Sequence, residues 1–206
     1  IAPLPQIVEL CKQHRAALMV DDAHSVGVLG GGRGTAEHFG VTEGVDLIMG
    51  TFSKSFASLG GFIAGSEEMV DYIKHYARSL IYSASMPPSA VAAVSAAIDV
   101  MLEEPERIER LWAVSDRMRR ELNAMGYQTG TSCTPIIPVV IGDDMKTLLS
   151  WRALFDAGVY TNAVIPPAVP PNGSLLRTSY IATHTDEQID RVLELFYGVG
   201  KELALI

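Results

Sequence analysis

The sequence predicts an α/β fold in its first half and a smaller α+β unit in its second. Two short apolar runs, 16–20 and 45–49, each end abruptly in polar residues. Runs of this kind are typical of parallel strands that are buried on both faces. From Pro105 onwards the chain becomes charged and amphipathic, as surface helices do. We therefore predict two domains, 1–104 and 105–206, the first with a mostly parallel sheet and helices on both of its faces.

The elements of the first domain follow from local patterns. Helical spacing of apolar residues predicts a helix over 4–15 before the first strand. Ser66 and the acids that follow it are a favourable helix start, because a serine cap and early negative charge complement the helix N-terminus. The remaining expected elements are a glycine loop at 27–34, a strand framed by glycines at 60–65, a helix at 67–79 and a helix of small residues at 88–103.

The second domain alternates helices and strands. Its amphipathic spacing predicts a long surface helix at its start, and its β-branched runs predict strands. The expected elements are helices at 106–125, 145–157 and 186–197 and strands at 135–141 and 175–181.

Composition excludes several functional classes. The chain has 206 residues, of which 48% are apolar and 19% are charged, and this excludes intrinsic disorder. The formal net charge of -8 argues against binding a nucleic-acid backbone. Cys11 and Cys133 cannot form a disulfide framework, so we expect a reducing, cytoplasmic location. The histidines and cysteines lack the spacing of a metal site, and we expect no metal.

Three uncharged runs raise the question of a membrane span. The most helix-like of them, between Arg78 and Asp99, contains Pro87 and Pro88 and five serines, which favour a loop that enters a soluble helix. We therefore expect no transmembrane segment. The chain opens at Ile1 without an initiator Met or a basic leader region, so we expect it to be part of a longer chain with no signal peptide.

Reactive residues follow both predicted parallel strands. Asp21 and His24 come after the first strand, and Lys54 comes after the second. Ligands of open parallel sheets sit outside the carboxyl ends of the strands, so an acid, an imidazole and an amine should meet there. This set suits pyridoxal phosphate, because an amine forms a Schiff base with its aldehyde and a carboxylate keeps its ring nitrogen protonated. Thr51 and Ser53 add hydroxyls that suit the phosphate.

Several ordered motifs carry a resemblance to a known family. They are Val20-Asp21-Asp22-Ala23-His24-Ser25-Val26-Gly27, Gly32-Arg33-Gly34, Gly50-Thr51-Phe52-Ser53-Lys54-Ser55 and Tyr82-Ser83-Ala84-Ser85-Met86-Pro87-Pro88. Together they resemble the α-oxoamine synthases, which are fold-type I pyridoxal phosphate enzymes. The likeness covers essentially the whole chain and corresponds to the C-terminal half to two-thirds of such a protein. It implies the C-terminal part of the family's large, cofactor-binding domain, followed by its small domain.

The resemblance assigns a role to each matching residue. Lys54 would be the Schiff-base lysine, Asp21 would pair with the pyridinium nitrogen, and His24 would hydrogen-bond the phenolic oxygen of the cofactor. Thr51 and Ser53 would hold the phosphate within the subunit.

The resemblance also implies a homodimer whose sites lie at the subunit interface. Ser83 and Ala84 would reach the phosphate of the neighbouring subunit's cofactor. Arg177 falls where the family keeps an arginine for the substrate carboxylate, a task that suits the planar, two-pronged guanidinium.

The implied reaction is a decarboxylative condensation of an amino acid with an acyl-CoA. Four segments, 34–40, 51–55, 59–62 and 164–170, most resemble the serine palmitoyltransferase branch, which implies L-serine, palmitoyl-CoA and the first step of sphingolipid synthesis. The resemblance leaves open a peripheral contact with a membrane. In the family, the part that precedes these residues supplies a histidine on the cofactor ring and much of the acyl-CoA surface. We therefore expect the segment alone to be inactive.

Other functions stay open at this point. Glycine or alanine could be condensed with a different acyl-CoA, as in other members of the family. A fold-type I aminotransferase shares the placement of Asp21 and Lys54, and some relatives are non-catalytic subunits that lack the lysine. A nucleotide-binding domain is disfavoured, because the glycines at 27–34 do not form a phosphate-binding loop directly between a strand and a helix.

Overall fold

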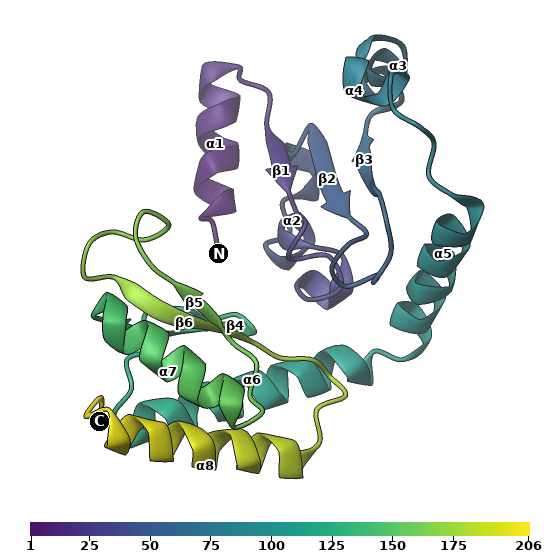
Figure 1. The fold of residues 1–206 in the computed structure, drawn as a ribbon. Helices are drawn as coiled ribbons and strands as arrows, with labels where there is room; N and C mark the ends of the chain where they lie inside the picture. The colour runs from purple at the N-terminus through teal and green to yellow at the C-terminus, as the bar shows by residue number, and fades with distance from the viewer. The chain divides into compact units, whose positions relative to one another are not determined.

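The chain consists of two compact units. The computed structural model describes all residues, 1–206. One unit is Ala2–Ile108, and the other is Glu109–Ile206 together with Ile1 (Figure 1). The division falls inside helix α6 (Glu106–Met125), whereas the sequence predicts the boundary between 104 and 105. Each unit has its own sheet and its own core.

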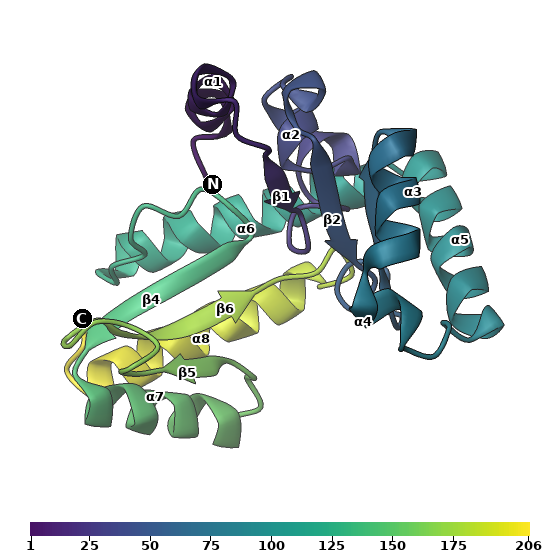
Figure 2. The same cartoon turned by 90° about the horizontal axis from the view of Figure 1, so that it is seen from above.

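The first unit contains a three-stranded sheet in the order β1-β2-β3, as labelled in Figure 1, and Figure 2 shows β1 beside β2 from above. Strand β1 (Met19–Asp21) runs parallel to β2 (Leu47–Thr51), and β3 (Gly61–Gly65) runs antiparallel to β2. Helix α1 (Leu4–His14) packs beside this sheet through Leu4 and Val8. These two side chains are buried in one cluster with apolar residues of the strands, so α1 covers one face.

The sheet differs from the prediction in two ways. The pairing of β2 with β3 is antiparallel, because the segment 52–60 that joins them holds no helix to carry the chain back across the sheet. The strands are also less buried than predicted. Met19 is 55% exposed and Asp21 is exposed, since no element of this unit covers that side of β1.

Short helices complete the first unit. Ser66 caps α3 (Glu67–Tyr76) as predicted, because its hydroxyl accepts a hydrogen bond from Met69 N. The helix predicted over 67–79 ends earlier, since Ala77 is extended and a separate turn follows it. The other helical elements are η1 (Gly30–Gly32), α2 (Thr35–His38), η2 (Thr42–Gly44), α4 (Arg78–Ile81) and α5 (Pro88–Glu103).

The second unit is an antiparallel sheet with helices on one face. Strands β4 (Ile136–Gly142), β6 (Ser174–Ser179) and β5 (Asn162–Val164) pair in the order β4-β6-β5. Helices α6, α7 (Asp144–Asp156) and α8 (Asp186–Glu202) pack on the same sheet face. Their shared core contains Met118, Leu122, Ile137, Val139, Leu154, Leu176 and Phe196. The predicted strands at 135–141 and 175–181 are present, while β5 was not predicted.

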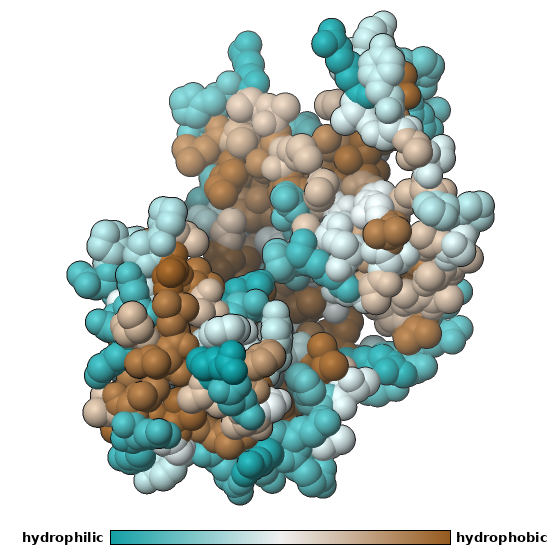
Figure 3. Space-filling view, in the orientation of Figure 1, coloured by the Kyte–Doolittle hydropathy of each residue, from teal (hydrophilic) through white to brown (hydrophobic).

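The α/β fold class of the prediction is confirmed, with a mixed rather than mostly parallel sheet in the first unit. No helix of the chain combines the length and the apolar character that crossing a membrane requires. Helix α7 presents apolar side chains at the surface, seen as brown areas in Figure 3. Met145 is 64% exposed and Phe155 is 46% exposed. Groups of exposed apolar side chains often mark contact surfaces.

A buried tyrosine joins the elements of the second unit. The hydroxyl of Tyr127 donates a hydrogen bond of 2.7 Å to Phe196 O on α8, and the two rings meet edge to face. We expect Tyr127→Phe to lower the free energy of unfolding by about 1 kcal/mol, because it removes one buried hydrogen bond and keeps the ring. Urea denaturation of the natural protein that carries these residues measures the change.

Tyr160→Phe is the matched control for this prediction. Tyr160 lies in the same unit and is 75% exposed, so its replacement should change the free energy of unfolding by less than about 0.5 kcal/mol. Equal effects of the two substitutions would contradict the importance of the Tyr127 hydrogen bond.

Candidate active site

The parallel pairing of β1 and β2 brings their carboxyl ends to one edge of the sheet. Asp21, the last residue of β1, is in register with Met49 of β2. Thr51, the last residue of β2, follows two positions later. The segments that carry Asp21, His24 and Lys54 therefore leave the sheet at the same edge, as expected from the sequence.

A tight turn follows β1. Asp22 N donates to Met49 O at 2.8 Å, which extends the strand pairing by one residue past Asp21. Asp22 O then accepts the backbone amides of Ser25 and Val26. The exposed carboxylate of Asp21 is oriented by this turn, because its Oδ1 accepts Ala23 N at 2.9 Å. The turn also presents His24 at the surface.

The segment 52–60 between β2 and β3 contains Lys54 and is called the lysine loop. Two buried aromatic residues hold it in place. Phe52 and Phe56 are buried in one apolar cluster, with their rings edge to face at 5.7 Å. Between them, Ser53 and Lys54 are exposed. Thr51 Oγ1 and Ser53 Oγ lie 2.8 Å apart in a hydrogen bond, so the two predicted phosphate-binding hydroxyls form one pair.

Ser55 joins the lysine loop to the loop that follows His24. Its Oγ donates a hydrogen bond of 2.8 Å to Val26 O. A Cβ placed on Gly27 would lie 2.6 Å from Ser55 Cβ, and Gly27 has a φ of +82°. Only glycine combines this backbone conformation with so close an approach. Ser55, the residue directly after Lys54, is therefore bound to the segment 26–27 that follows the turn carrying His24.

Ser83 and Ala84 are not brought to this edge by any contact within the chain. They lie in the exposed segment between α4 and α5, where Ser83 Oγ donates to Ser79 O of the preceding turn. The lysine loop contacts helix α5, which follows this segment, because Ser58 Oγ donates a hydrogen bond of 2.9 Å to Ala90 O. The predicted role of both residues towards a neighbouring subunit stays a prediction.

Arg177 lies in the second unit, on the central strand β6. Its cross-strand neighbours are Pro138 on β4 and Asn162 on β5. Leu176 and Thr178 on either side point into the core, so the half-buried Arg177 faces away from the helices. Its guanidinium forms no hydrogen bond or ion pair within the chain, so its charge is available to an anion.

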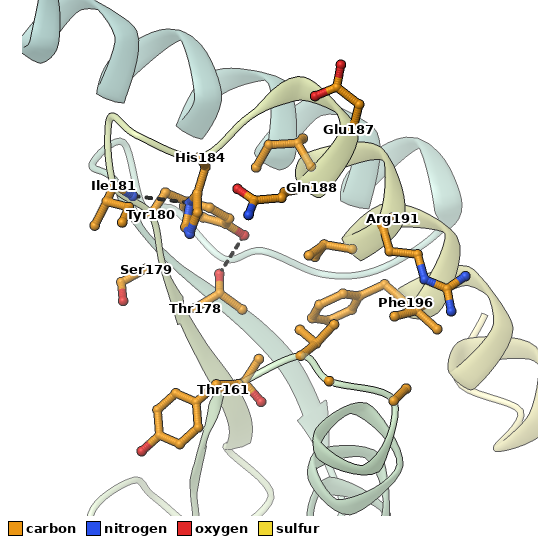
Figure 4. A pocket seen from close by; sticks show the side chains of 17 residues that line it. Thr161, Thr178, Ser179, Tyr180, Ile181, His184, Glu187, Gln188, Arg191 and Phe196 are labelled. Atoms are coloured by element: carbon orange, nitrogen blue, oxygen red, sulfur yellow. Dashed lines mark hydrogen bonds between the residues drawn. The ribbon is translucent and has the colours of Figure 1, made fainter.

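The second unit also contains a cavity of about 650 Å³, shown in Figure 4. Tyr180 and Thr178, whose hydroxyls are hydrogen-bonded at 2.9 Å, line one side of it, and Phe196 of α8 lines another. Burial raises the pKa of Tyr180 to about 12 and lowers the pKa of His184, so both side chains are neutral near pH 7. Arg177 is not among the lining residues, and the cavity is separate from the predicted carboxylate site.

Two structurally important residues escaped the sequence analysis. Ser55 was read only as part of a motif, although its position directly after Lys54 decides how the lysine loop is held. Asp22 was not distinguished from Asp21, yet it is fully buried while Asp21 is exposed. The alternation of side chains along an extended strand could have separated the two acids.

Comparisons with known proteins show the family of the chain. The family model "Aminotransferase class I and II" matches residues 1–196. Serine palmitoyltransferase of Sphingobacterium spiritivorum is 49% identical over 98% of this chain and 51% of that protein. The corresponding enzyme of Bacteriovorax stolpii is 51% identical over 98% of this chain and 48% of that protein. An 8-amino-7-oxononanoate synthase of Alkaliphilus oremlandii is 44% identical over 100% of this chain and 52% of that protein.

Solved structures show the same relationship. A serine palmitoyltransferase described with a PLP internal aldimine matches with a TM-score of 0.96 and 37% identity, over 100% of this chain and 52% of that one. An 8-amino-7-oxononanoate synthase of Francisella tularensis, 22% identical, shares the fold with a TM-score of 0.81 over 96% of this chain and 58% of that one. The chain thus spans about half the length of the curated relatives it matches. It belongs to the aminotransferase class I and II family of enzymes, in the α-oxoamine synthase group that its motifs indicated.

Proposed function

We propose that the protein carrying these residues is a pyridoxal phosphate-dependent acyltransferase. It condenses an amino acid with an acyl-CoA and releases CoA and CO2, which leaves an α-amino ketone. One observation carries the proposal. The carboxylate of Asp21 and the loop of Lys54 leave neighbouring parallel strands at one edge and are tied together by the bond from Ser55 to Val26.

The residues at this edge fit pyridoxal phosphate. The chemistry of the cofactor requires an amine for its aldehyde, an anion for its protonated ring nitrogen and donors for its phosphate. Lys54 is an amine and Asp21 is an anion, while the hydroxyl pair of Thr51 and Ser53 provides a donor. The side chains of all four residues are at least partly accessible. When bound, the cofactor supplies an electron-accepting ring that stores the electron pair left on carbon when a proton or CO2 departs.

Lys54 and Asp21 have complementary tasks in this proposal. Lys54 Nζ would hold the cofactor through its aldehyde, and as a free amine it would accept the α-proton of the substrate. Asp21 keeps a negative charge beside the ring nitrogen, which stabilises the protonated ring. Because Ala23 N already donates to Oδ1 of Asp21, Oδ2 would be the oxygen that accepts from the ring nitrogen.

The remaining residues of the edge orient the cofactor. In the hydrogen-bonded pair of Thr51 and Ser53 one hydroxyl proton lies between the two oxygens, so the pair would donate the other proton to a phosphate oxygen. His24 would hydrogen-bond the phenolic oxygen and so limit rotation of the ring. The fixed turn that carries His24 supports this assignment, because an orienting group acts only when it is itself held in place.

Arg177 binds the carboxylate of the amino acid. A half-buried guanidinium without an internal acidic partner is suited to a small anion, to which it can donate two parallel hydrogen bonds. Ser83 and Ala84 serve the site of a second subunit in a homodimer. The exposure of their segment, with Tyr82 84% exposed, supports a contact outside this chain.

L-serine and palmitoyl-CoA are the proposed substrates, which would make this the first step of sphingolipid synthesis. The support is the identity of 44% to 51% with proteins named serine palmitoyltransferase. Relatives named 8-amino-7-oxononanoate synthase at 43% to 44% identity favour a second candidate, in which glycine or alanine reacts with another acyl-CoA. We propose a cytoplasmic protein that neither spans a membrane nor binds nucleic acid, and that contacts a membrane at most peripherally.

Titration of the natural protein with amino acids tests the proposed function. We expect a saturable change in the visible absorption of the bound cofactor with L-serine, and none with glycine or L-alanine at the same concentrations. A change with glycine or L-alanine alone would select the second candidate. Absence of any visible absorption after addition of pyridoxal phosphate would refute the assignment of the cofactor.

Lys54→Ala should abolish covalent attachment of the cofactor. Borohydride reduction fixes pyridoxal phosphate to a protein only where a lysine amine holds its aldehyde, and mass spectrometry detects the adduct. Lys74→Ala, on the exposed surface of α3, is the matched control and should retain the adduct at Lys54. An adduct that persists in the Lys54→Ala protein would disprove the role of this lysine.

Arg177→Ala should weaken binding of the amino acid at least about 10-fold, because a charge-assisted, two-pronged hydrogen bond contributes about 1.5–3 kcal/mol. Affinity for the cofactor should stay unchanged. Spectroscopic titration with L-serine and with pyridoxal phosphate separates the two effects. Arg152→Ala on α7 removes an exposed arginine of the same unit and should leave both affinities as they are. Unchanged affinity for L-serine in Arg177→Ala would reject the assignment.

A further inference from the structure

Asp22 is a buried carboxylate that the proposed reaction does not use. Its side chain is 0% exposed, and it is the only Asp, Glu, Lys, Arg or His side chain that is buried in the chain. A buried charge is costly unless hydrogen bonds compensate it. Such a group at the edge of the proposed site therefore calls for a physical reason.

Hydrogen bonds from two directions hold this carboxylate. Ser25 Oγ, from the far end of the turn, donates to Asp22 Oδ1. Thr35 N, from the first turn of α2, lies 3.1 Å from both Oδ1 and Oδ2. Asp22 thus links its own turn to the loop that precedes α2.

Gly34 makes room for the carboxylate. A Cβ on Gly34 would collide with Asp22 Oδ2, and the φ of Gly34 is +103°, which side chains rarely adopt. The loop around Gly34 and the turn after β1 are thus built around one carboxylate, and a shift of either would break the contact.

The turn that Asp22 closes carries two residues of the proposed site. Ala23 N, the next backbone amide, orients Asp21 through its Oδ1. His24 lies between Asp22 and Ser25, and these two residues are tied together by side-chain and backbone hydrogen bonds. Loosening Asp22 would therefore move both the anion and the imidazole relative to the cofactor.

We propose that Asp22 is a positioning residue that holds Asp21 and His24 in the geometry the cofactor needs, through Ser25, Thr35 and Gly34. This inference rests on the proposed function. Asp22 does not touch the cofactor or the substrate. It acts on the reaction only through the two residues that it places.

Asp22→Asn separates this role from mere stability. The amide has the size of the carboxylate, but its NH2 group cannot accept from Thr35 N, which faces both oxygens. Asp46→Asn is the matched control. Asp46 Oδ2 accepts Leu18 N at 2.7 Å at the opposite end of β1 and β2, so this substitution also removes a carboxylate bonded to a backbone amide.

Both variants should melt at a lower temperature than the natural protein. At a temperature where all are folded, Asp22→Asn should slow exchange of the α-proton of L-serine by about 10- to 100-fold, because misplacement of about 1 Å can cost that much. It should also shift the pH midpoint of the cofactor's visible absorption. Asp46→Asn should leave the exchange rate and the midpoint unchanged. NMR in D2O and a spectroscopic pH titration give the two readouts.

The proposal is overturned if Asp22→Asn keeps the exchange rate and the pH midpoint of the natural protein while its stability falls as in Asp46→Asn. If Asp22→Asn does not fold, Ser25→Ala removes one of the donors with a smaller change. Slower exchange in Ser25→Ala would then support the role of Asp22, and an unchanged rate and midpoint would overturn it. A natural protein that shows no cofactor absorption would instead refute the proposed function, and the inference with it.

Discussion

The parallel pairing of β1 with β2 is the constraint on which the proposed site depends. Antiparallel strands would send Asp21 and Lys54 to opposite ends of the sheet, whereas the register of Asp21 with Met49 makes both chain segments leave at one edge. The pairing alone leaves two loops free to separate. The hydrogen bond from Ser55 to Val26 holds the two loops together, and Gly27 permits this close approach because it has no side chain. The sheet therefore sets where the loops begin, and one side chain beside Lys54 sets how they meet.

In each loop the exposed residues face a possible ligand, while nearby buried residues hold the backbone in place. Asp21 is exposed and can face a ligand, while Asp22 is buried and fixes the turn. In the same way, Phe52 and Phe56 are buried and keep Lys54 at the surface between them. Asp21 thus stands next to a buried anchor, and Lys54 lies two positions from each of two buried anchors. Apolar burial secures the lysine loop, whereas hydrogen bonds to a buried charge secure the aspartate turn.

The sequence predicts the features that depend on local patterns, but it does not predict those that depend on tertiary contacts. The apolar runs of β1 and β2 and the serine cap of α3 are local, and they were predicted well. The direction of β3 depends on the length of its connection, and β5 has only three residues, too few to show a period. At the site, residue types and order revealed the reactive groups. The burial of Asp22 depends on Gly34 and Thr35, twelve and thirteen positions further along the chain, so only the structure could reveal it.

The proposed function places cofactor chemistry and substrate recognition on different units of the chain. The first unit contains the amine, the acid and the hydroxyls, and all are tied to one sheet edge. The second unit contains Arg177 on the face of its antiparallel sheet that lies away from the helices of that unit, and this unit has its own core. Because their cores are separate, a change at Arg177 can alter amino-acid affinity without disturbing the hydrogen bonds that hold Asp21 and Lys54. Affinity for the amino acid can then change on the second sheet while the residues that hold the cofactor on the first are preserved.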